Sequence, residues 1–235
     1  AKSKWAGEQR VTEICTDNQI SLGVIRPTLI YGPGSRYGLA PWLSFFAMRS
    51  WRGHTIFGMR GGPMTHVVHV RDVSRAALHL ADNPTVAGVF NVADDTPLQA
   101  SALIGSMCLA LGARLREFRI PWSIIKVLRP IKPFLIWLFK GPNRKFARAW
   151  KRLAAEENLE LSLEPRFDLD WMDFLSQDNI FDNRQLKETG FSYSNPDARE
   201  AMPDTIAWYR QQRWLPTTKE ATTEVQEEVT NRRSA

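Results

Sequence analysis

Two pairs of side chains come closest to the types and spacing that chemistry requires. His66 and His69 suggest a shared metal ion, but residues three apart on a strand point to opposite faces. We therefore expect structural roles for both and predict no metal site. Asp94 and Asp95 directly follow a predicted strand, where a turn is the better interpretation than a pair of acid and base carboxylates.

The sequence lacks a recognisable phosphate-binding turn. A nucleotide-binding α/β protein is expected to carry a glycine-rich turn between its first strand and the following helix. No GxGxxG or GxxGxxG pattern occurs, and no helix pattern directly follows the cluster of Gly58, Gly61 and Gly62. From the residues alone, an α/β sheet is predicted and its cofactor turn is missing.

Composition is that of a globular protein in a reducing compartment. The 235 residues are 43% hydrophobic and 24% charged, which suits one large domain or two small ones. Cys15 and Cys108 lie far apart, so neither a disulfide framework nor a CxxC motif is present. We expect a cytoplasmic protein, with membrane association left open by the charge distribution.

Positive charge is concentrated in residues 119–152. This segment holds ten Lys and Arg and no acidic residue, whereas the other 21 Lys and Arg are outnumbered by 25 Asp and Glu. It also carries Trp122, Trp137 and Phe139. Three interpretations stay open: a solvated basic face, a peripheral membrane contact, and, ranked last because no binding motif is present, a nucleic-acid surface. We predict no nucleic-acid partner.

Strand and helix patterns alternate along the chain, which predicts an α/β fold. Helices are expected at 2–17, from near Asp72 to before Pro84, at 98–111 ending at Gly112, at 181–189 and at 197–213. Strands are expected within 20–32, 65–70 and 87–95. Residues after Pro216 have almost no apolar side chains and are expected to be a disordered tail.

Several of these segments resemble one enzyme family. "SKWAGE", "GVIRPTLIYGPG", "THVVHVRD", "GVFNVADD" and "DNRQLKETGF" occur in order between Lys4 and about Leu215. Together they resemble the second half of an extended short-chain dehydrogenase/reductase, the NAD-dependent epimerase/dehydratase family, 3β-hydroxysteroid dehydrogenase-like members included.

The resemblance implies the C-terminal part of a Rossmann-type doubly wound parallel sheet, with a smaller mixed α/β substrate domain. Residues 1–96 would be the remainder of the dinucleotide-binding domain, with an excursion into the substrate domain at about 34–64. Residues 97–215 would be mainly substrate domain, and 216–235 the tail.

The same resemblance implies a cofactor and a catalytic lysine. The family's active-site helix reads Tyr-x-x-x-Lys with a Glu a few residues on; Ser3-Lys4 and Glu8 fit, and the Tyr would fall one residue before Ala1. The chain therefore looks cut directly after its catalytic tyrosine. Lys4 would lower the pKa of that Tyr, about 10 in isolation, and bind the nicotinamide ribose. Pro27 and Thr28 would contact the nicotinamide end of NAD or NADP in the full-length protein of which this chain would be a part.

Departures from the family pattern bear on the substrate. Nucleotide-sugar enzymes of the family usually carry an Asn where this chain has Leu29 and an Arg where it has Thr65. Two anchors for a diphosphate are thus missing, although Arg60 or His66 could substitute. Tyr31 completes the residues expected to face the substrate.

We therefore expect a small-molecule substrate that is an apolar alcohol or ketone, sterol-, isoprenoid- or lipid-like. One alternative is a nucleotide-sugar epimerase or dehydratase. Another is a non-catalytic remnant domain that binds a partner or a membrane surface. The fragment is expected to be inactive alone, and a homodimer is left open.

Overall fold

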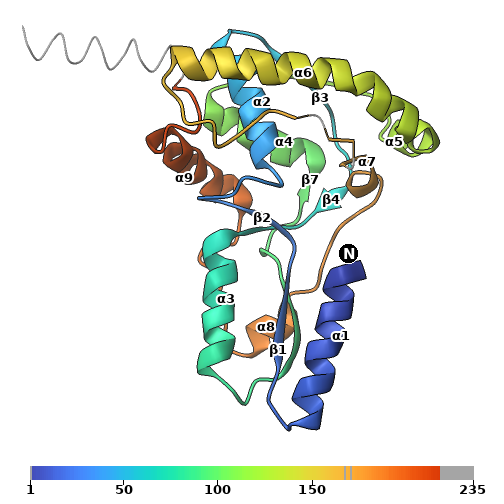
Figure 1. The fold of residues 1–235 in the computed structure, drawn as a ribbon, viewed down its shortest axis with the longest axis vertical. Coiled ribbons are helices and arrows are strands. Elements are labelled where there is room, and N and C mark those ends of the chain that lie inside the picture. Colours follow the sequence, from blue (N-terminus) through green and yellow to red (C-terminus); the bar gives the residue numbers. More distant parts are fainter. Residues whose placement is uncertain (1, 167, 170, 218–235) are drawn as a thin grey trace, which may run out of the picture.

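The chain divides into a lower and an upper half (Figure 1). The structure is a computed structural model that describes residues 2–166, 168–169 and 171–217. From residue 218 onward, the predicted disordered tail lies outside the described residues.

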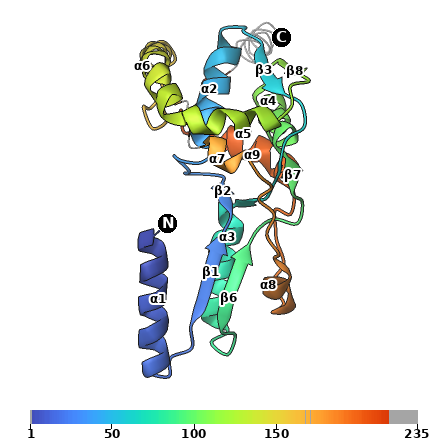
Figure 2. The same cartoon turned by 90° about the vertical axis from the view of Figure 1, so that its right-hand side faces the viewer.

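The lower half is built on one parallel strand pair. β1 (Gly23–Pro27) pairs with β6 (Gly88–Val92), while α3 (Val70–Asp82) and α8 (Arg184–Glu188) pack against these strands. Apolar side chains from α3, β6 and α8 form a small core that includes Leu80, Phe90 and Leu186. α1 (Lys2–Asp17) runs alongside β1 in both views but contributes no buried residue (Figures 1 and 2).

A break at Thr28 divides the apolar run that the sequence predicts as one strand. The Thr28 N–H still donates to Val92 O of β6, at 3.0 Å. The chain then changes partner, because β2 (Leu29–Tyr31) pairs in parallel with β5 (Val67–His69). Pro27 has no N–H to donate to a ladder, which favours a change of partner at this position.

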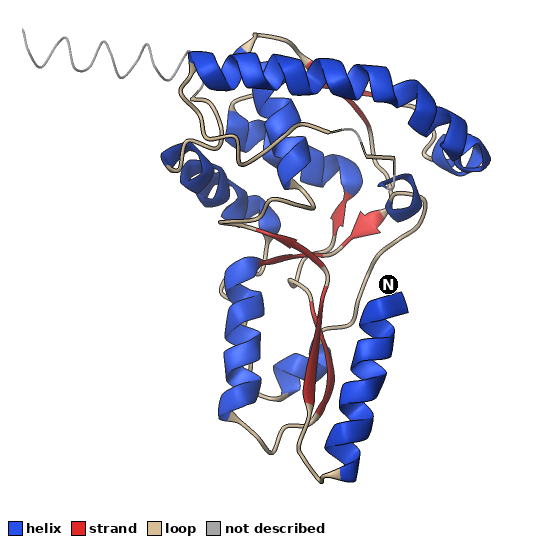
Figure 3. Ribbon diagram, viewed as in Figure 1, coloured by secondary structure: helices blue, strands red, loops and turns tan. Residues whose placement is uncertain are grey.

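The upper half contains the larger core. α2 (Ala40–Trp51), α4 (Ala100–Leu111) and α9 (Ala198–Gln211) pack together there, and the second half of α6 (Lys132–Glu156) covers them. Two short strand pairs flank these helices (Figure 3): β3 (Ile56–Met59) with β8 (Leu115–Phe118) in parallel, and β4 (Met64–Thr65) with β7 (Leu98–Gln99) antiparallel.

The predicted mixed α/β class with parallel strands is confirmed. Within the described residues the strands form four two-stranded pairs, of which three are parallel, so the continuous doubly wound sheet that the resemblance implies is not seen there. The sequence from 34 to 64 contributes α2 and β3 to the upper half, whereas α8 returns to the lower half.

Capping residues explain where the predicted helices begin and end. α3 starts two residues before Asp72 because His69 Nδ1 accepts a hydrogen bond from the Arg71 N–H, at 3.3 Å. α4 ends at Gly112, as predicted, because this residue adopts φ +70° in the left-handed region that glycine favours. Asp197 caps α9 by accepting from the Arg199 N–H, at 2.8 Å.

The basic segment is helical over most of its length. α5 (Ser123–Leu128), a 3₁₀ turn (Arg129–Ile131) and α6 follow one another without a loop. The short helix α7 (Trp171–Phe174) packs near this segment. Among the helices of the described residues, none combines the length and the apolar character needed to cross a bilayer.

Candidate functional site

The carboxyl ends of parallel strands meet where the two halves join. β1 and β6 both run toward this junction, and β2 lies within it (Figure 2). In open α/β sheets, ligands bind beyond the carboxyl ends of the strands. The junction is therefore the candidate site.

Two buried hydroxyls at the junction have no hydrogen-bond partner among the residues that the structure describes. They are Thr28 Oγ1, between β1 and β2, and Tyr31 OH, at the end of β2. The Tyr31 ring packs edge-to-face against His69, with 5.2 Å between ring centroids. Burial, reinforced by the charge of Asp94, raises the pKa of the Tyr31 phenol. Leaving such a group unpaired costs about 1–3 kcal/mol, so a ligand group that reached either hydroxyl would gain a hydrogen bond that the described residues do not supply.

Thr65 lies at an apolar slot beside the junction. Its side chain is only 1% exposed, and Oγ1 has no partner in the described part of the chain. The other lining side chains are apolar or aromatic and include Leu39, Trp42, Leu103, Met107, Trp171 and Phe174. Leu29 packs against the same core. The slot has about 40 Å³ of free space, so a substrate larger than a few atoms requires α7 to move.

Arg60 belongs to a different, more open cleft. Its N–H donates to Phe118 O and its carbonyl accepts from Trp122 Nε1, both at 2.9 Å. The cleft, of about 490 Å³, also has Glu117 and Arg119 in its lining. The structure therefore does not bring Arg60 together with Thr65.

Lys4 lies in the first turn of α1, with its side chain exposed. The helix begins at the height of the junction and runs away from it alongside β1 (Figure 1). One turn further on, Glu8 forms an ion pair with Arg26 of β1. This pair joins α1 to the strand that ends at Pro27 and Thr28, the two residues predicted at the nicotinamide end. Pro27 is exposed.

Asp94 is a residue that sequence reasoning did not identify as part of the site. It follows β6 in a loop that bends at Asp95, rather than in the predicted turn; its carboxyl is fully buried, and neither oxygen has a hydrogen-bond partner among the described residues. Burial, with the nearby charges of Asp197 and Asp95, raises its pKa to about 8. The backbone N–H of Thr96 acts in the opposite direction and lowers the pKa, although its geometry does not meet that of a hydrogen bond. No sequence pattern distinguishes this Asp from the neighbouring Asp95, which bonds to Asn183 at 2.9 Å.

His66 and His69 both accept hydrogen bonds from backbone N–H groups. His66 Nδ1 accepts from the Phe181 N–H at 2.9 Å, and His69 caps α3. Burial lowers the pKa of both imidazoles. In the described ranges, no three His, Cys, Asp or Glu side chains gather as a metal site would require.

The fold is similar to that of proteins solved with NAD or NADPH. UDP-glucose 4-epimerase of Thermus thermophilus, solved with NAD, matches with a TM-score of 0.53 at 15% identity, over 89% of this chain and 53% of that one. dTDP-glucose 4,6-dehydratase of Bacillus anthracis, also with NAD, matches with a TM-score of 0.53 at 12% identity, over 89% and 51%. RMD of Pseudomonas aeruginosa, solved with NADPH, matches with a TM-score of 0.54 at 13% identity, over 89% and 54%.

These matches confirm the expected resemblance at the level of fold. The chain is structurally similar to part of the extended short-chain dehydrogenase/reductases, the NAD-dependent epimerase/dehydratase family, and spans about half the length of the structures it matches. No family model and no protein with curated annotation matches the sequence.

Proposed function

We propose that this chain forms the lysine-bearing, substrate-binding half of a nicotinamide-dependent oxidoreductase or epimerase. The observation that carries the proposal is the pair of unpartnered buried hydroxyls, Thr28 and Tyr31, at the carboxyl ends of β1 and β2. The fold likeness supports the enzyme class. We further propose that the complete enzyme, here called the parent, is longer than this chain and carries the glycine-rich turn and the catalytic Tyr.

The residues suited to hold NAD or NADP in this chain are Lys4, Pro27 and Thr28. The unpartnered Thr28 hydroxyl fits a polar group at the nicotinamide end. When bound, the nicotinamide ring supplies hydride transfer. The Lys4 ammonium would donate to the ribose hydroxyls and stabilise the tyrosinate expected one residue before Ala1, which would then act as a base near neutral pH.

An apolar alcohol or ketone is the proposed substrate. The slot beside Thr65 is lined by aromatic and aliphatic side chains and offers no accessible polar surface, which suits the apolar body of such a substrate. The buried, unpartnered Thr65 hydroxyl would bind the substrate's single oxygen once the slot opens. Leu29 supports this choice because it adds apolar surface where the family's nucleotide-sugar enzymes usually carry an Asn. A charged diphosphate buried against these side chains would lack a counter-ion.

A nucleotide sugar is the second candidate, and the Arg60 cleft is the observation that favours it. This cleft is open, about 490 Å³ in volume, and carries two guanidinium groups, Arg60 and Arg119. Guanidinium groups suit phosphate oxygens. In this alternative the diphosphate lies in the cleft, and Thr65 does not contact it.

The experiment that separates the two candidates uses the parent with two substrate panels. We expect the parent to oxidise sterol and isoprenoid alcohols with NAD or NADP. We expect little turnover of UDP- or dTDP-sugars. The opposite preference would establish the nucleotide-sugar alternative. A folded parent that turns over neither panel would support a non-catalytic remnant.

Two variants of the parent sharpen the choice. Thr65→Val removes the unpartnered hydroxyl at nearly constant volume, so it should raise KM for the apolar substrate about three- to tenfold without lowering Tm. Arg60→Gln is the matched variant at the other cleft and should leave KM for that substrate unchanged. If Arg60→Gln raises KM and Thr65→Val does not, the substrate lies in the Arg60 cleft.

A further inference from the structure

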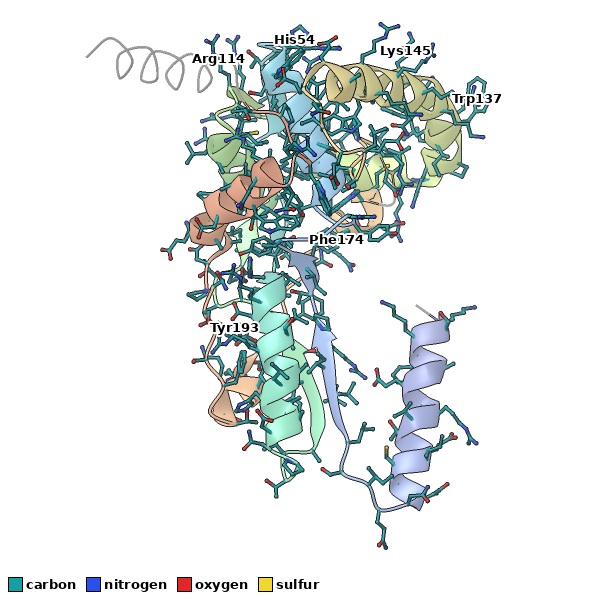
Figure 4. The ribbon with its side chains drawn as sticks, turned by 60° about the vertical axis from the view of Figure 1, so that its left-hand side comes forward. His54, Arg114, Trp137, Lys145, Phe174 and Tyr193 are labelled. Carbon is teal, nitrogen blue, oxygen red and sulfur yellow. The ribbon has the colours of Figure 1, made fainter. Side chains whose placement is uncertain are left out.

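The basic segment carries a projecting apolar surface. We call residues 123–141 the arm: α5, the 3₁₀ turn and the first part of α6. Figure 1 shows α5 at the outer end of α6, beyond the rest of the upper half, and Figure 4 shows Trp137 at the outer edge of the molecule. The side chains of this arm decide what it can contact.

Five apolar side chains form one exposed stripe along the arm. They follow a 3–4–3–4 spacing, which places them on one helical face: Ile124, Val127, Ile131, Phe134 and Leu138. Val127 is 73% exposed and Phe134 is 58% exposed. Trp137, 64% exposed, stacks on Phe134 with 5.9 Å between ring centroids. An exposed apolar surface this continuous marks an interaction site.

The stripe is distinct from the face by which the segment joins the core. In the second half of α6, Phe146, Trp150 and Leu153 pack into the upper core. On the arm itself, Ile125 and Leu135 are half-buried; Ile125 lies off the stripe, whereas Leu135, four residues after Ile131, lies along its edge. The most exposed apolar side chains of the arm are therefore Val127, Phe134 and Trp137, and these are available to a partner.

Charge decides which partner fits. The arm and the rest of α6 up to Ala155 carry no acidic residue, and Lys140, Arg144, Lys145 and Arg148 are all exposed. Figure 4 shows Lys145 on the outer surface of the upper half. A second copy docked stripe to stripe would bring these four exposed cations of each copy close together, and the repulsion would oppose it.

We propose that the arm binds the surface of an anionic lipid bilayer, with its stripe in the boundary between headgroups and acyl chains. Phe134 and Trp137 are side chains that favour this boundary, and basic residues are attracted to the anionic headgroups beside it. Arg129 and Lys132 are paired with Asp173 of α7, so the cations offered to the lipid are Lys140 at the end of the arm and the exposed Arg144, Lys145 and Arg148 that follow it along α6. Because apolar and basic side chains alternate along one continuous helical segment, it lies in the plane of the interface. The inference is independent of the proposed reaction, because it rests on the arm alone.

The test is co-sedimentation of the full chain with phosphatidylglycerol-containing vesicles and with phosphatidylcholine vesicles. The chain should bind the anionic vesicles in low salt, bind the neutral ones far more weakly, and dissociate as salt screens the surface. Val127→Ser/Phe134→Ser/Trp137→Ser should reduce the bound fraction at least about tenfold, because it removes the apolar contribution. The circular dichroism spectrum should not change, because all three side chains are exposed.

The matched control replaces three exposed apolar side chains elsewhere. Leu78, Leu109 and Leu161 are 63%, 83% and 64% exposed, and the variant with all three changed to Ser should bind as the unchanged chain does. Equal loss in both triple variants, or no binding to anionic vesicles, would overturn the proposal.

Two other partners are distinguished by the same variants. If the chain ignores vesicles but is a dimer by light scattering, and the arm variant is a monomer, the stripe binds a second copy. If it ignores vesicles but binds a fluorescent RNA through the arm, the basic surface recognises nucleic acid. Either result contradicts the bilayer proposal.

Discussion

At the scale of single residues, Lys4 has the most specific proposed role. In the parent, Lys4→Ala should lower kcat by orders of magnitude at neutral pH, because the neighbouring Tyr would no longer ionise readily. Activity should partly recover at high pH, where the Tyr ionises without help. Lys2→Ala is the matched control, since Lys2 is also exposed in the first turn of α1. Equal pH–rate profiles for the Lys4 variant and the unchanged parent would show that Lys4 is only a surface lysine.

Asp94 gives a prediction about stability rather than turnover. Its pKa is raised to about 8, so between about pH 4 and pH 8 the folded state keeps a proton that the unfolded state has lost. Stability therefore falls as pH rises through this window. Asp94→Asn should remove the fall and raise the free energy of unfolding by about 1–3 kcal/mol at pH 8, with little change at pH 4.

Urea unfolding of both proteins at several pH values measures this effect. Asp95→Asn serves as the control, because Asp95 is partly exposed and bonded to Asn183 and Lys187. A stability difference between Asp94→Asn and the unchanged chain that is the same at pH 4 and pH 8 would contradict the buried, protonated state.

At the scale of elements, Asp173 joins the arm to α7. It accepts from Arg129 Nε at 2.9 Å and from Lys132 Nζ at 2.7 Å, and the bond to Lys132 chiefly lowers its pKa. A lowered pKa in the folded state means that the contribution of these pairs is present above about pH 4 and is lost as pH falls. Asp173→Asn should therefore speed amide exchange in α7 and in the arm at pH 7, because the neutral amide cannot replace the two ion pairs.

Asp182→Asn is the matched control, since Asp182 is exposed and, among the described residues, forms its ion pair with Arg184, two residues away. It should leave exchange in α7 unchanged. Exchange that is equally slow in the Asp173 variant would mean that aromatic packing, such as Trp42 against Trp171, holds α7 without the ion pairs. Because α7 lines the apolar slot, this measurement also tests how the slot opens.

The elements show how far local pattern predicts structure. The helices at 2–17 and 98–111 were predictable because periodicity and a glycine stop are local signals. The break at Thr28 was not, because a change of strand partner depends on contacts far away in sequence. The 25-residue α6 was missed because it continues through Gly141 and Pro142, where sequence rules favour a stop. The burial of Asp94 and the exposure of the stripe also depend on the tertiary fold.

At the scale of the whole molecule, α1 and β1 leave a side of the lower half uncovered. α1 buries no residue, and Trp5 is 58% exposed. Within the described residues, β1 pairs with β6 alone, so its other edge has no strand partner. In the proposed parent, the remainder of the dinucleotide-binding domain would cover these surfaces and bring the phosphate-binding turn to the junction.

The chain as given should therefore not bind a dinucleotide tightly. A glycine-rich turn leading into a helix N-terminus supplies much of the affinity for the phosphates, and the sequence contains no such turn. Lys4, Pro27 and Thr28 would contact only the nicotinamide end. Titration calorimetry of the chain with NAD, NADH and NADPH should detect no micromolar binding, whereas the parent should bind one of them. Micromolar binding by the chain alone would move the cofactor site away from the junction, and the Arg60 cleft, with its two guanidinium groups, would be the first place to look for the phosphates.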